Sequence, residues 1–366
     1  MNEMATTYGN NIKISIYGGS HDEEIGITAE GLPAGESFDF DRLLAFMKRR
    51  APGNAKYSTT RKEADRPIFV SGVDESFTLD GSGFKAIIKN SNMRSGDYSN
   101  LADVPRPSHA DYPARVKFGE GVDLRGGGHF SGRLTAPMCI VGGICLQILE
   151  RMGIKIAAHI YSIKDEKDIE FDPCNVNGQD FATLSEHDFP TLSIMSGEKM
   201  QEIIETARLD CDSVGGIIEC AVIGLPVGVG EHMFAGLEGR ISSIVFSVPA
   251  VKAIEFGKGF GSTNLFGSEN NDPYYMDGDE IKTKTNNCGG ISGGMSNGMP
   301  LIFRAGIKPT PSISKEQDSV SLSRRENTKL VIKGRHDPCI VPRAVPVIEA
   351  ATAIAILDAI LDKKAD

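Results

Sequence analysis

The sequence lacks the patterns that mark membrane-spanning, secreted and disulfide-bonded proteins. No stretch of roughly 18 apolar residues is free of polar groups; residues 136–149 come nearest and run into Glu150-Arg151. The N-terminal segment MNEMATTYGNN lacks the basic and then apolar layout of a signal peptide. The seven cysteines are odd in number, scattered and without a C-x-x-C pair, which argues against a disulfide framework and a zinc ribbon. We therefore expect a cytoplasmic protein with reduced thiols and no membrane contact.

The motifs of several common enzyme classes are missing as well. There is no G-x-x-x-x-G-K-[ST] phosphate loop and no G-x-S-x-G nucleophile elbow. Residues 81–86 (GSGFKA) match a dinucleotide fingerprint, but a β-type run follows them where a helix is required, and Asp80-Gly81 is typical of a hairpin turn. The sequence thus favours neither a Walker-type site, a Rossmann site nor a hydrolase triad.

The chain also lacks the positive charge of a nucleic-acid-binding protein, since its formal net charge is −10. Basic residues nevertheless concentrate between positions 48 and 62, a pattern that favours binding of a small anion over a polymer. Glycine is abundant: there are 41 among 366 residues, or about 11% against a typical ~7%. Runs at 126–128, 289–290 and 293–294 indicate loops whose backbone approaches a ligand closely.

Hydrophobic periodicity predicts alternating strands and helices. Strands are predicted at 12–17, 25–32, 67–73, 84–89, 154–163, 217–225 and 329–333, and helices at 39–48 and 197–210. The run LTAPMCIVGGICLQILERMG is apolar nearly all round and predicts a central buried helix that ends at Gly153. We expect an amphipathic C-terminal helix from Val345 and an irregular surface insertion over 160–195. Residues 25–35 and 215–228 resemble each other, which is weak evidence of duplication. Without linkers, one domain is expected.

Two histidines stand out because each follows a strand-to-loop break with a serine beside it. They are His21 in GGSHDEE and His109 in RPSHAD, and such positions display functional groups. His159, His187 and His232 we interpret as structural. Arginines in glycine- or proline-marked loops are candidates for binding phosphate and carboxylate; they are Arg106, Arg133 and Arg335. The sequence therefore predicts an enzyme for a small, phosphorylated anion, with His109 as an acid–base group.

Two other classes remain open at this point. A metal-dependent phosphohydrolase would use His21, Asp22, Glu23, His109 and Asp111 as ligands, although their spacing matches no specified site. A non-enzymatic anion or RNA binder would use residues 48–62, and its binding would depend on salt.

Several long segments together resemble the chorismate synthase family, in the same order along the chain. They include RRAPGNAKYSTTRKEAD, RSGDYS, RPSHADY, RGGGHFSGR, DSVGG, FSVPAVKAIEFGKGF, TNNCGGISGGMSNGMP, KPTPSI and GRHDPCIVPRAVPVIEA. The resemblance covers essentially the whole chain. It implies an α+β fold, a β-α-β sandwich of antiparallel sheets around central helices, as a single domain over residues 1–366.

The resemblance also implies an activity. Enzymes of this family remove phosphate and a ring proton from 5-enolpyruvylshikimate 3-phosphate in an anti-1,4-elimination that gives chorismate, and they require reduced FMN. They are carbon–oxygen lyases of the shikimate pathway, which leads to the aromatic amino acids. A substrate with two carboxylates and a phosphate accounts for a basic cluster in an acidic protein. NADPH as an external reductant, a homotetramer and no metal or nucleic acid are implied too. No reductase domain is visible, so we expect external supply of reduced flavin.

The resemblance also implies roles for individual residues, at the positions that match the motifs of the family. The resemblance implies that His21 protonates the departing phosphate, that His109 protonates the reduced flavin, and that Asp337 helps remove the ring proton. Contacts with FMN are implied for His129, Phe130, Ser131, Pro249, Ala250, Gly293, Lys308, Pro309, Thr310, Pro311, Ser312 and Arg335. Basic positions for the substrate anions or NADPH are Arg50, Lys56 and Arg133, with Arg49 as supporting charge.

The chain departs from the usual family pattern next to the expected cofactor. Many members have GGGRSSARET where this chain has GGGHFSGRLT, so His129 and Phe130 replace an arginine and a serine. Lys56 likewise keeps charge without the planar fork of arginine. One fixed positive charge is thereby lost or made dependent on pH, because histidine titrates near neutrality.

We predict an active enzyme whose affinity for flavin is altered by this substitution. The variant His129→Arg restores a fixed charge, and its binding of reduced FMN should differ measurably from that of the native protein. An unchanged affinity would show that the substitution is silent.

Overall fold

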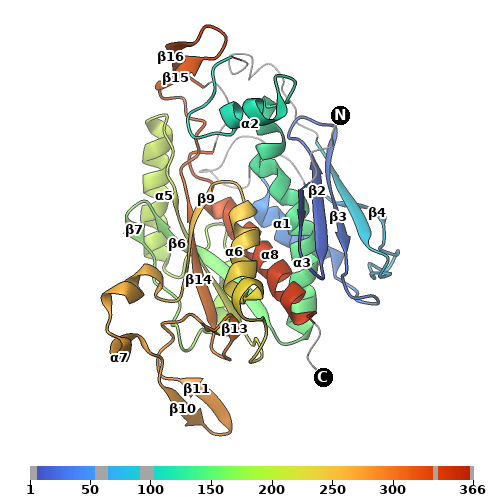
Figure 1. Cartoon of the computed structure of the whole chain (residues 1–366), viewed down its shortest axis with the longest axis vertical. Coiled ribbons are helices and arrows are strands. Elements are labelled where there is room, and N and C mark those ends of the chain that lie inside the picture. The colour runs from blue at the N-terminus through green and yellow to red at the C-terminus, as the bar shows by residue number, and fades with distance from the viewer. Residues whose placement is uncertain (1–5, 54–64, 91–102, 333–336, 363–366) are drawn as a thin grey trace.

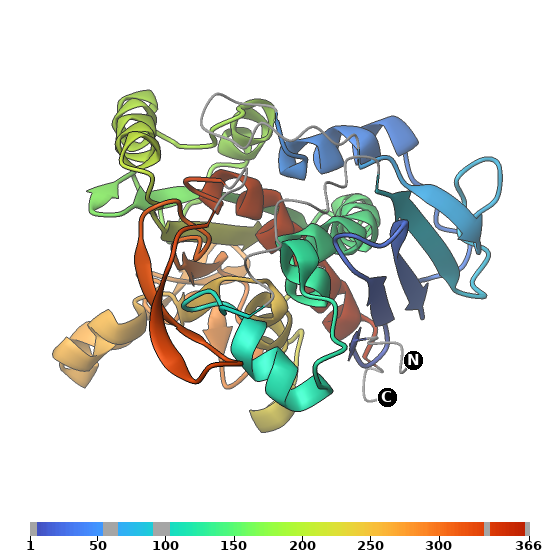
Figure 2. The same cartoon turned by 90° about the horizontal axis from the view of Figure 1, so that it is seen from above.

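Two five-stranded antiparallel sheets enclose a layer of helices (Figure 1). The structure is a computed structural model that describes residues 6–53, 65–90, 103–332 and 337–362. Seen from above, the central helices lie between the sheets (Figure 2). The arrangement confirms the predicted α+β sandwich of antiparallel sheets around central helices.

The N-terminal sheet has the strand order β1-β2-β3-β5-β4. Its inner face is apolar because every second residue of β3 and β5 is buried, among them Ile25, Ile27, Ala86 and Ile88. The five strands are β1 (Thr6–Tyr8), β2 (Lys13–Gly18), β3 (Glu24–Glu30), β4 (Ile68–Ser71) and β5 (Phe84–Lys89). The apparent dinucleotide fingerprint leads into β5 and no helix, as expected.

The second sheet has the strand order β7-β6-β8-β14-β9. Its strands are β6 (Lys155–Ile163), β7 (Glu166–Lys167), β8 (Gly216–Ile223), β9 (Val251–Phe256) and β14 (Leu301–Ile307). The two similar sequence segments form β3 and β8, each the middle strand of its sheet. Three two-stranded ribbons complete the β structure of the described residues: β10 (Tyr274–Asp277) with β11 (Glu280–Thr283), β12 (Ile291–Ser292) with β13 (Met295–Ser296), and β15 (Gln317–Ser321) with β16 (Glu326–Leu330).

The helices are placed by capping residues and apolar stripes. In α1, the Asp39 side chain accepts a hydrogen bond of 3.0 Å from the Arg42 amide, and Leu43, Met47 and Arg50 share the buried face. The α-helices are α1 (Phe40–Arg50), α2 (Asp111–Phe118), α3 (Thr135–Arg151), α4 (Gly178–Glu186), α5 (Ile194–Leu209), α6 (Leu237–Ser247), α7 (Gly267–Asn270) and α8 (Val341–Ile360). Short 3₁₀ turns are η2 (Arg125–Phe130), η3 (Gly132–Leu134), η4 (Met233–Ala235) and η5 (Gly259–Asn264).

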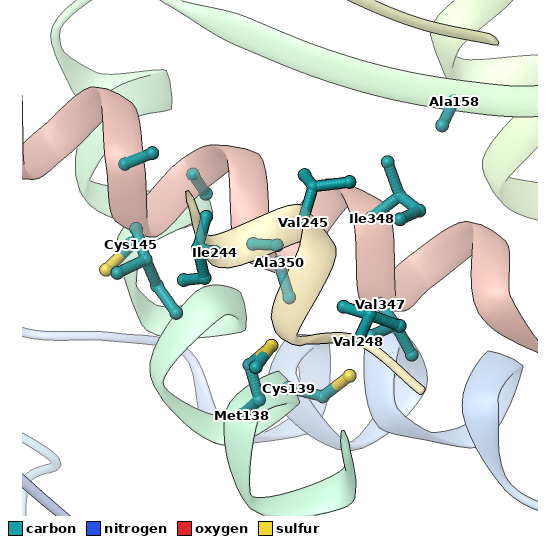
Figure 3. Packing of buried hydrophobic residues seen from close by; sticks show 14 of the residues in the cluster. Met138, Cys139, Cys145, Ala158, Ile244, Val245, Val248, Val347, Ile348 and Ala350 are labelled. Carbon is teal, nitrogen blue, oxygen red and sulfur yellow. The ribbon is translucent and has the colours of Figure 1, made fainter. Parts of the chain in front are cut away.

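Helices α3 and α8 cross closely in the middle of the core. A Cβ atom on Gly142 would lie 2.2 Å from Cβ of Ala350, and one on Gly143 would lie 2.6 Å from Leu43 of α1. Gly142 therefore sets how closely α3 approaches α8, and Gly143 makes room for the Leu43 side chain of α1. Figure 3 shows the surrounding apolar packing, with side chains from α3, α6 and α8 interleaved.

Two expectations about the exterior were wrong. The C-terminal helix was expected to be amphipathic, with one face exposed. It is instead buried on nearly every side, because it packs against α3, α6 and the second sheet. Residues 160–195 are no irregular insertion: they complete β6, form β7 and α4, and bury Phe171, Phe181 and Leu184 in a small cluster against the second sheet. The predicted strand at 329–333 begins earlier and ends at Leu330.

By length and composition, one helical segment of the described chain, Gly132–Arg151, is long and apolar enough to cross a membrane. Its most apolar window is 89% buried inside the protein, as befits the predicted central core helix.

A histidine held between two carboxylates lies within the second sheet. His159 is fully buried, with Nδ1 3.2 Å from Asp168 Oδ2 and Nε2 3.0 Å from Glu219 Oε2. Burial alone would lower the pKa of His159, but the hydrogen bonds to both carboxylates outweigh it and raise the pKa above its ordinary value. His159 thus keeps its proton to higher pH than an ordinary histidine and links two buried carboxylates, in keeping with its predicted structural class.

The His159 cation should make stability depend on pH. Its contribution is complete below the unfolded-state pKa of about 6.5 and is lost as pH rises through the raised folded-state value. Compared with His159→Gln, the native protein should lose up to about 1.4 kcal/mol of unfolding free energy per pH unit between the unfolded-state and folded-state pKa values. Urea denaturation of both proteins between about pH 6 and pH 9 measures this difference; a constant gap would contradict the assignment.

Candidate active site

A cavity of about 670 Å³ opens where the two sheets and the central helices meet. One wall is apolar and includes Met138, Ile244, Val248 and Val347, which are labelled in Figure 3, together with residues of β1 and β2. The other wall is polar and cationic. Its charged residues in the described chain are Arg50, Arg106, Arg133, Lys308, Arg343 and Asp337. Five cations and one carboxylate line the described part of the cavity, a balance that favours anionic ligands despite the net charge of −10.

A single buried carboxylate holds two of these arginines. Arg50 Nη1 donates to Asp65 Oδ2 at 2.5 Å, and Arg133 Nη1 donates to Asp65 Oδ1. Burial alone would raise the pKa of Asp65, but the two guanidinium groups outweigh it and keep the pKa below its ordinary value. Arg50 also donates to Thr135 Oγ1 and to the Gly132 carbonyl. The cluster of Arg50, Arg133 and Asp65 thus combines two positive charges with one negative charge in a fixed geometry.

A third arginine fixes the carboxylate that faces the cavity. Arg343, on the first turn of α8, donates from Nη1 to Asp337 Oδ2 at 2.5 Å. Its Nε donates to the Arg50 carbonyl at 3.0 Å, which joins the start of α8 to the end of α1. Asp337 is thereby held as an oriented carboxylate beside the cationic cluster.

The RPSHAD segment forms a tight turn against the cavity. Ser108 has φ +58°, and its carbonyl accepts a hydrogen bond from Lys308 Nζ. Arg106 donates to both carboxylate oxygens of Asp111 and from Nη1 to Ser312 Oγ at 3.2 Å. This network holds His109 at the cavity wall. It joins the RPSHAD segment to residues 308–312, about two hundred positions later in the chain.

The three glycines at 126–128 pass between the two candidate histidines. All three have positive φ, of +59°, +97° and +53°. A Cβ atom on Gly126 would lie 2.4 Å from His21 Cε1, and one on Gly127 would lie 3.6 Å from His109 Nε2. His21 Nδ1 is 3.3 Å from Ser20 Oγ. The glycine-rich segment is therefore a spacer: its lack of side chains leaves room for both imidazoles beside the cavity.

His129 is bonded at both ring nitrogens. Its Nδ1 lies 2.9 Å from the Gly18 carbonyl and its Nε2 lies 3.2 Å from Thr6 Oγ1. A carbonyl oxygen only accepts, so Nδ1 carries a proton. Because the Thr6 hydroxyl can donate or accept, both the neutral and charged rings fit. The ring of Phe130 packs against Phe118 of α2, with centroids 6.2 Å apart.

Most of the predicted site residues meet at this cavity. Those that line it are Arg50, His109, His129, Phe130, Ser131, Arg133, Pro249, Ala250, Lys308, Thr310, Pro311, Ser312 and Asp337. His21 and Pro309 lie next to lining residues and are not themselves in the lining. Lys56 and Arg335 lie outside the described residues.

Two predicted site residues are placed elsewhere. Arg49 donates from both terminal nitrogens to Glu349, at 2.6 and 2.9 Å, and so ties α1 to α8. Gly293 lies in the turn between β12 and β13, outside the cavity lining. The direct role of Arg49 here is to stabilise the helix pair.

Sequence reasoning missed the acidic partners and the apolar wall. Asp65 follows a run of charged residues and resembles a surface charge, so the local pattern gives no signal of its burial. Asp111 was considered only as a metal ligand, yet its oxygens are taken up by Arg106 and His109. Among the described residues, no group of three or more His, Cys, Asp or Glu side chains could hold a metal ion. These contacts weaken the phosphohydrolase alternative.

The fold and the site together define an α+β protein with a cationic cavity, lined by groups that suit a small anion and acid–base chemistry. Comparisons with known proteins identify the family of this chain. The family model of chorismate synthase matches residues 12–361, and the chain belongs to this family, whose members are lyases of the shikimate pathway.

Similar proteins agree over almost the full length. Chorismate synthase of Lancefieldella parvula is 46% identical over 365 residues, which cover 97% of this chain and 96% of the relative. Chorismate synthase of Thermococcus kodakarensis is 40% identical, with 98% of both chains covered. A crystal structure of chorismate synthase superposes with a TM-score of 0.73 at 24% identity, covering 97% of this chain and 93% of that one, and confirms the shared fold.

Replacing Gly126 with alanine should disturb His21 without unfolding the protein. The new methyl group would meet the imidazole at 2.4 Å, so the ring has to move. The variant Gly278→Ala is a matched control, since Gly278 has a similar φ of +62° and no atom within 4 Å of its Cβ position. Both variants should lose about 1 kcal/mol through backbone strain, but only Gly126→Ala should change the NMR signals of His21. Equal His21 spectra in both would contradict the spacer role.

Proposed function

We propose that this chain is a chorismate synthase: a carbon–oxygen lyase that removes phosphate from 5-enolpyruvylshikimate 3-phosphate by anti-1,4-elimination to give chorismate, with reduced FMN as cofactor. The observation that carries the proposal is the cationic wall of the cavity, with two histidines and one oriented carboxylate at its edge. A substrate with two carboxylates and a phosphate matches this charge.

The chain's own groups would divide the work as follows. Arg50 and Arg133 bind the anionic groups of the substrate, and their fixed geometry lowers the cost of orienting it. His21 gives a proton to the departing phosphate, and Asp337 takes up the ring proton. His109 would hold a proton at the cavity wall, where a bound reduced flavin could receive it.

The residues of the cavity fit a bound flavin phosphate. Thr310 Oγ1 is buried at the cavity wall and has no hydrogen-bond partner among the described residues, so it offers an unused polar atom to a ligand. Lys308, whose pKa is lowered by burial and then by the nearby Lys252, lies in the same segment. Together with Pro249, Ala250 and Ser312 these residues would hold the cofactor. Bound reduced flavin supplies transient electron donation, which promotes loss of phosphate.

Further properties are proposed on the family resemblance alone. They are a homotetrameric assembly, a cytoplasmic location, and supply of reduced flavin from outside the chain with NADPH as the possible reductant. Lys56 and Arg335 are proposed as further ligands of the substrate or NADPH and of the cofactor, respectively. Gly293 remains a proposed cofactor contact although it lies outside the cavity lining of this chain.

The test is anaerobic incubation of the protein with 5-enolpyruvylshikimate 3-phosphate and chemically reduced FMN. We expect chorismate and phosphate in equal amounts, no turnover with oxidised FMN alone, and full activity in the presence of a chelator. Phosphate without chorismate, or loss of activity with chelator, would support the metal-dependent hydrolase and sink the proposal.

A further inference from the structure

The side chain that faces the inner nitrogen of His109 is a buried carboxylate. Asp111 Oδ1 lies 2.7 Å from His109 Nδ1, and the Asp111 side chain is only 2% exposed. The opposite nitrogen, Nε2, is directed toward the glycine-rich segment at the cavity. His109 is thus held from behind, with its second nitrogen presented to a bound molecule.

Arg106 anchors this carboxylate. Its Nε donates to Asp111 Oδ2 and its Nη2 to Oδ1, both at 2.7 Å, and its backbone amide adds a third bond to Oδ2 at 2.9 Å. Burial would raise the pKa of Asp111, but the hydrogen bonds from Arg106 and His109 outweigh it and hold the pKa well below its ordinary value. Asp111 therefore stays ionised and does not take the Nδ1 proton.

The contacts of Nδ1 favour one tautomer of His109. Arg106 Nη2 lies 3.1 Å from His109 Nδ1, so the unprotonated nitrogen could in principle accept from arginine. That arrangement would set the lone pair of Nδ1 against a carboxylate oxygen at 2.7 Å, which is repulsive. A proton on Nδ1 would instead face Oδ1 at 2.7 Å, the oxygen that already accepts from Arg106 Nη2, and the closeness of Nη2 to Nδ1 would then follow from their shared neighbour.

We propose that Asp111 is a positioning residue for His109: it fixes the proton on Nδ1, so that all proton exchange with the bound molecule takes place at Nε2. When Nε2 gives up its proton, the positive charge leaves with it and a neutral ring with Nδ1–H remains. That ring is ready to accept a new proton at the same atom. The reaction served by this proton transfer rests on the proposed function.

The variant Asp111→Asn tests the proposal. Two donors from Arg106 meet at Oδ2, so the amide oxygen is expected there and the amide NH₂ at the place of Oδ1. That NH₂ would donate to Nδ1 and move the ring proton to Nε2. A comparable exchange of carboxylate for amide behind a catalytic histidine strongly reduces turnover, and we expect kcat to fall by about 10²-fold or more with little change in KM.

The tautomer is read directly by long-range ¹H–¹⁵N spectra of protein labelled at histidine nitrogen, with His109→Gln to assign the signal. We expect Nδ1–H in the native protein, Nε2–H in Asp111→Asn, and recovery of Nδ1–H with part of kcat in Asp111→Glu. The control is Glu219→Gln, which removes another buried carboxylate bonded to a histidine. It should alter the His159 signals alone and leave kcat unchanged.

The outcomes separate the two proposals. Nε2–H at His109 in the native protein, or loss of kcat in Asp111→Asn with the tautomer unchanged, overturns the positioning role. If the native protein forms no chorismate, the proposed function fails, while the spectra still decide the role of Asp111. Should Asp111→Asn fail to fold, the native and Asp111→Glu spectra decide it.

Discussion

The site depends on how closely three helices approach one another in the core. Gly142 lets α3 reach the backbone of α8 at Ala350, and Gly143 lets it reach α1 at Leu43. Because the helices are rigid rods, these two contacts determine where their ends lie. The end of α1 and the starts of α3 and α8 then meet at one point, and each contributes an arginine or its acceptor there. A side chain at Gly142 would meet the backbone of α8 and separate the two helices, whereas one at Gly143 would displace the Leu43 side chain of α1.

Charge compensation is the second requirement, since arginines gathered at a pocket repel one another. Asp65, Asp111 and Asp337 each accept from at least one arginine of the cavity wall. Among the described residues, the lining has five cations and these three carboxylates pair with its arginines, so the three carboxylates alone do not neutralise the wall. The remaining charge is available to a ligand, and the carboxylates fix the direction in which it is offered. An anion entering this pocket meets donors that are already oriented, so less reorganisation is needed on binding.

Local pattern predicted much of the fold, and the resemblance named many of the residues that line the cavity. Strand alternation located β2, β3, β5 and β6, and an apolar run located α3, because burial leaves its mark on neighbouring residues. The burial of α8 escaped prediction, since it depends on elements distant in sequence that cover its outer face. The pairing of Asp65 with two arginines was missed for the same reason: ion pairs across the fold leave no periodic signal.

Arg49 and Arg50 show how sharply position decides role. They are adjacent in sequence, but one residue of an α-helix turns the side chain by about 100°. Arg50 consequently faces the cavity cluster, whereas Arg49 reaches Glu349 on α8. Glu349 in turn accepts from the Ala158 amide of β6, so this ion pair joins α1, α8 and the second sheet. Arg49 thus supports the cavity through the scaffold that carries Arg50, although it does not line the cavity itself.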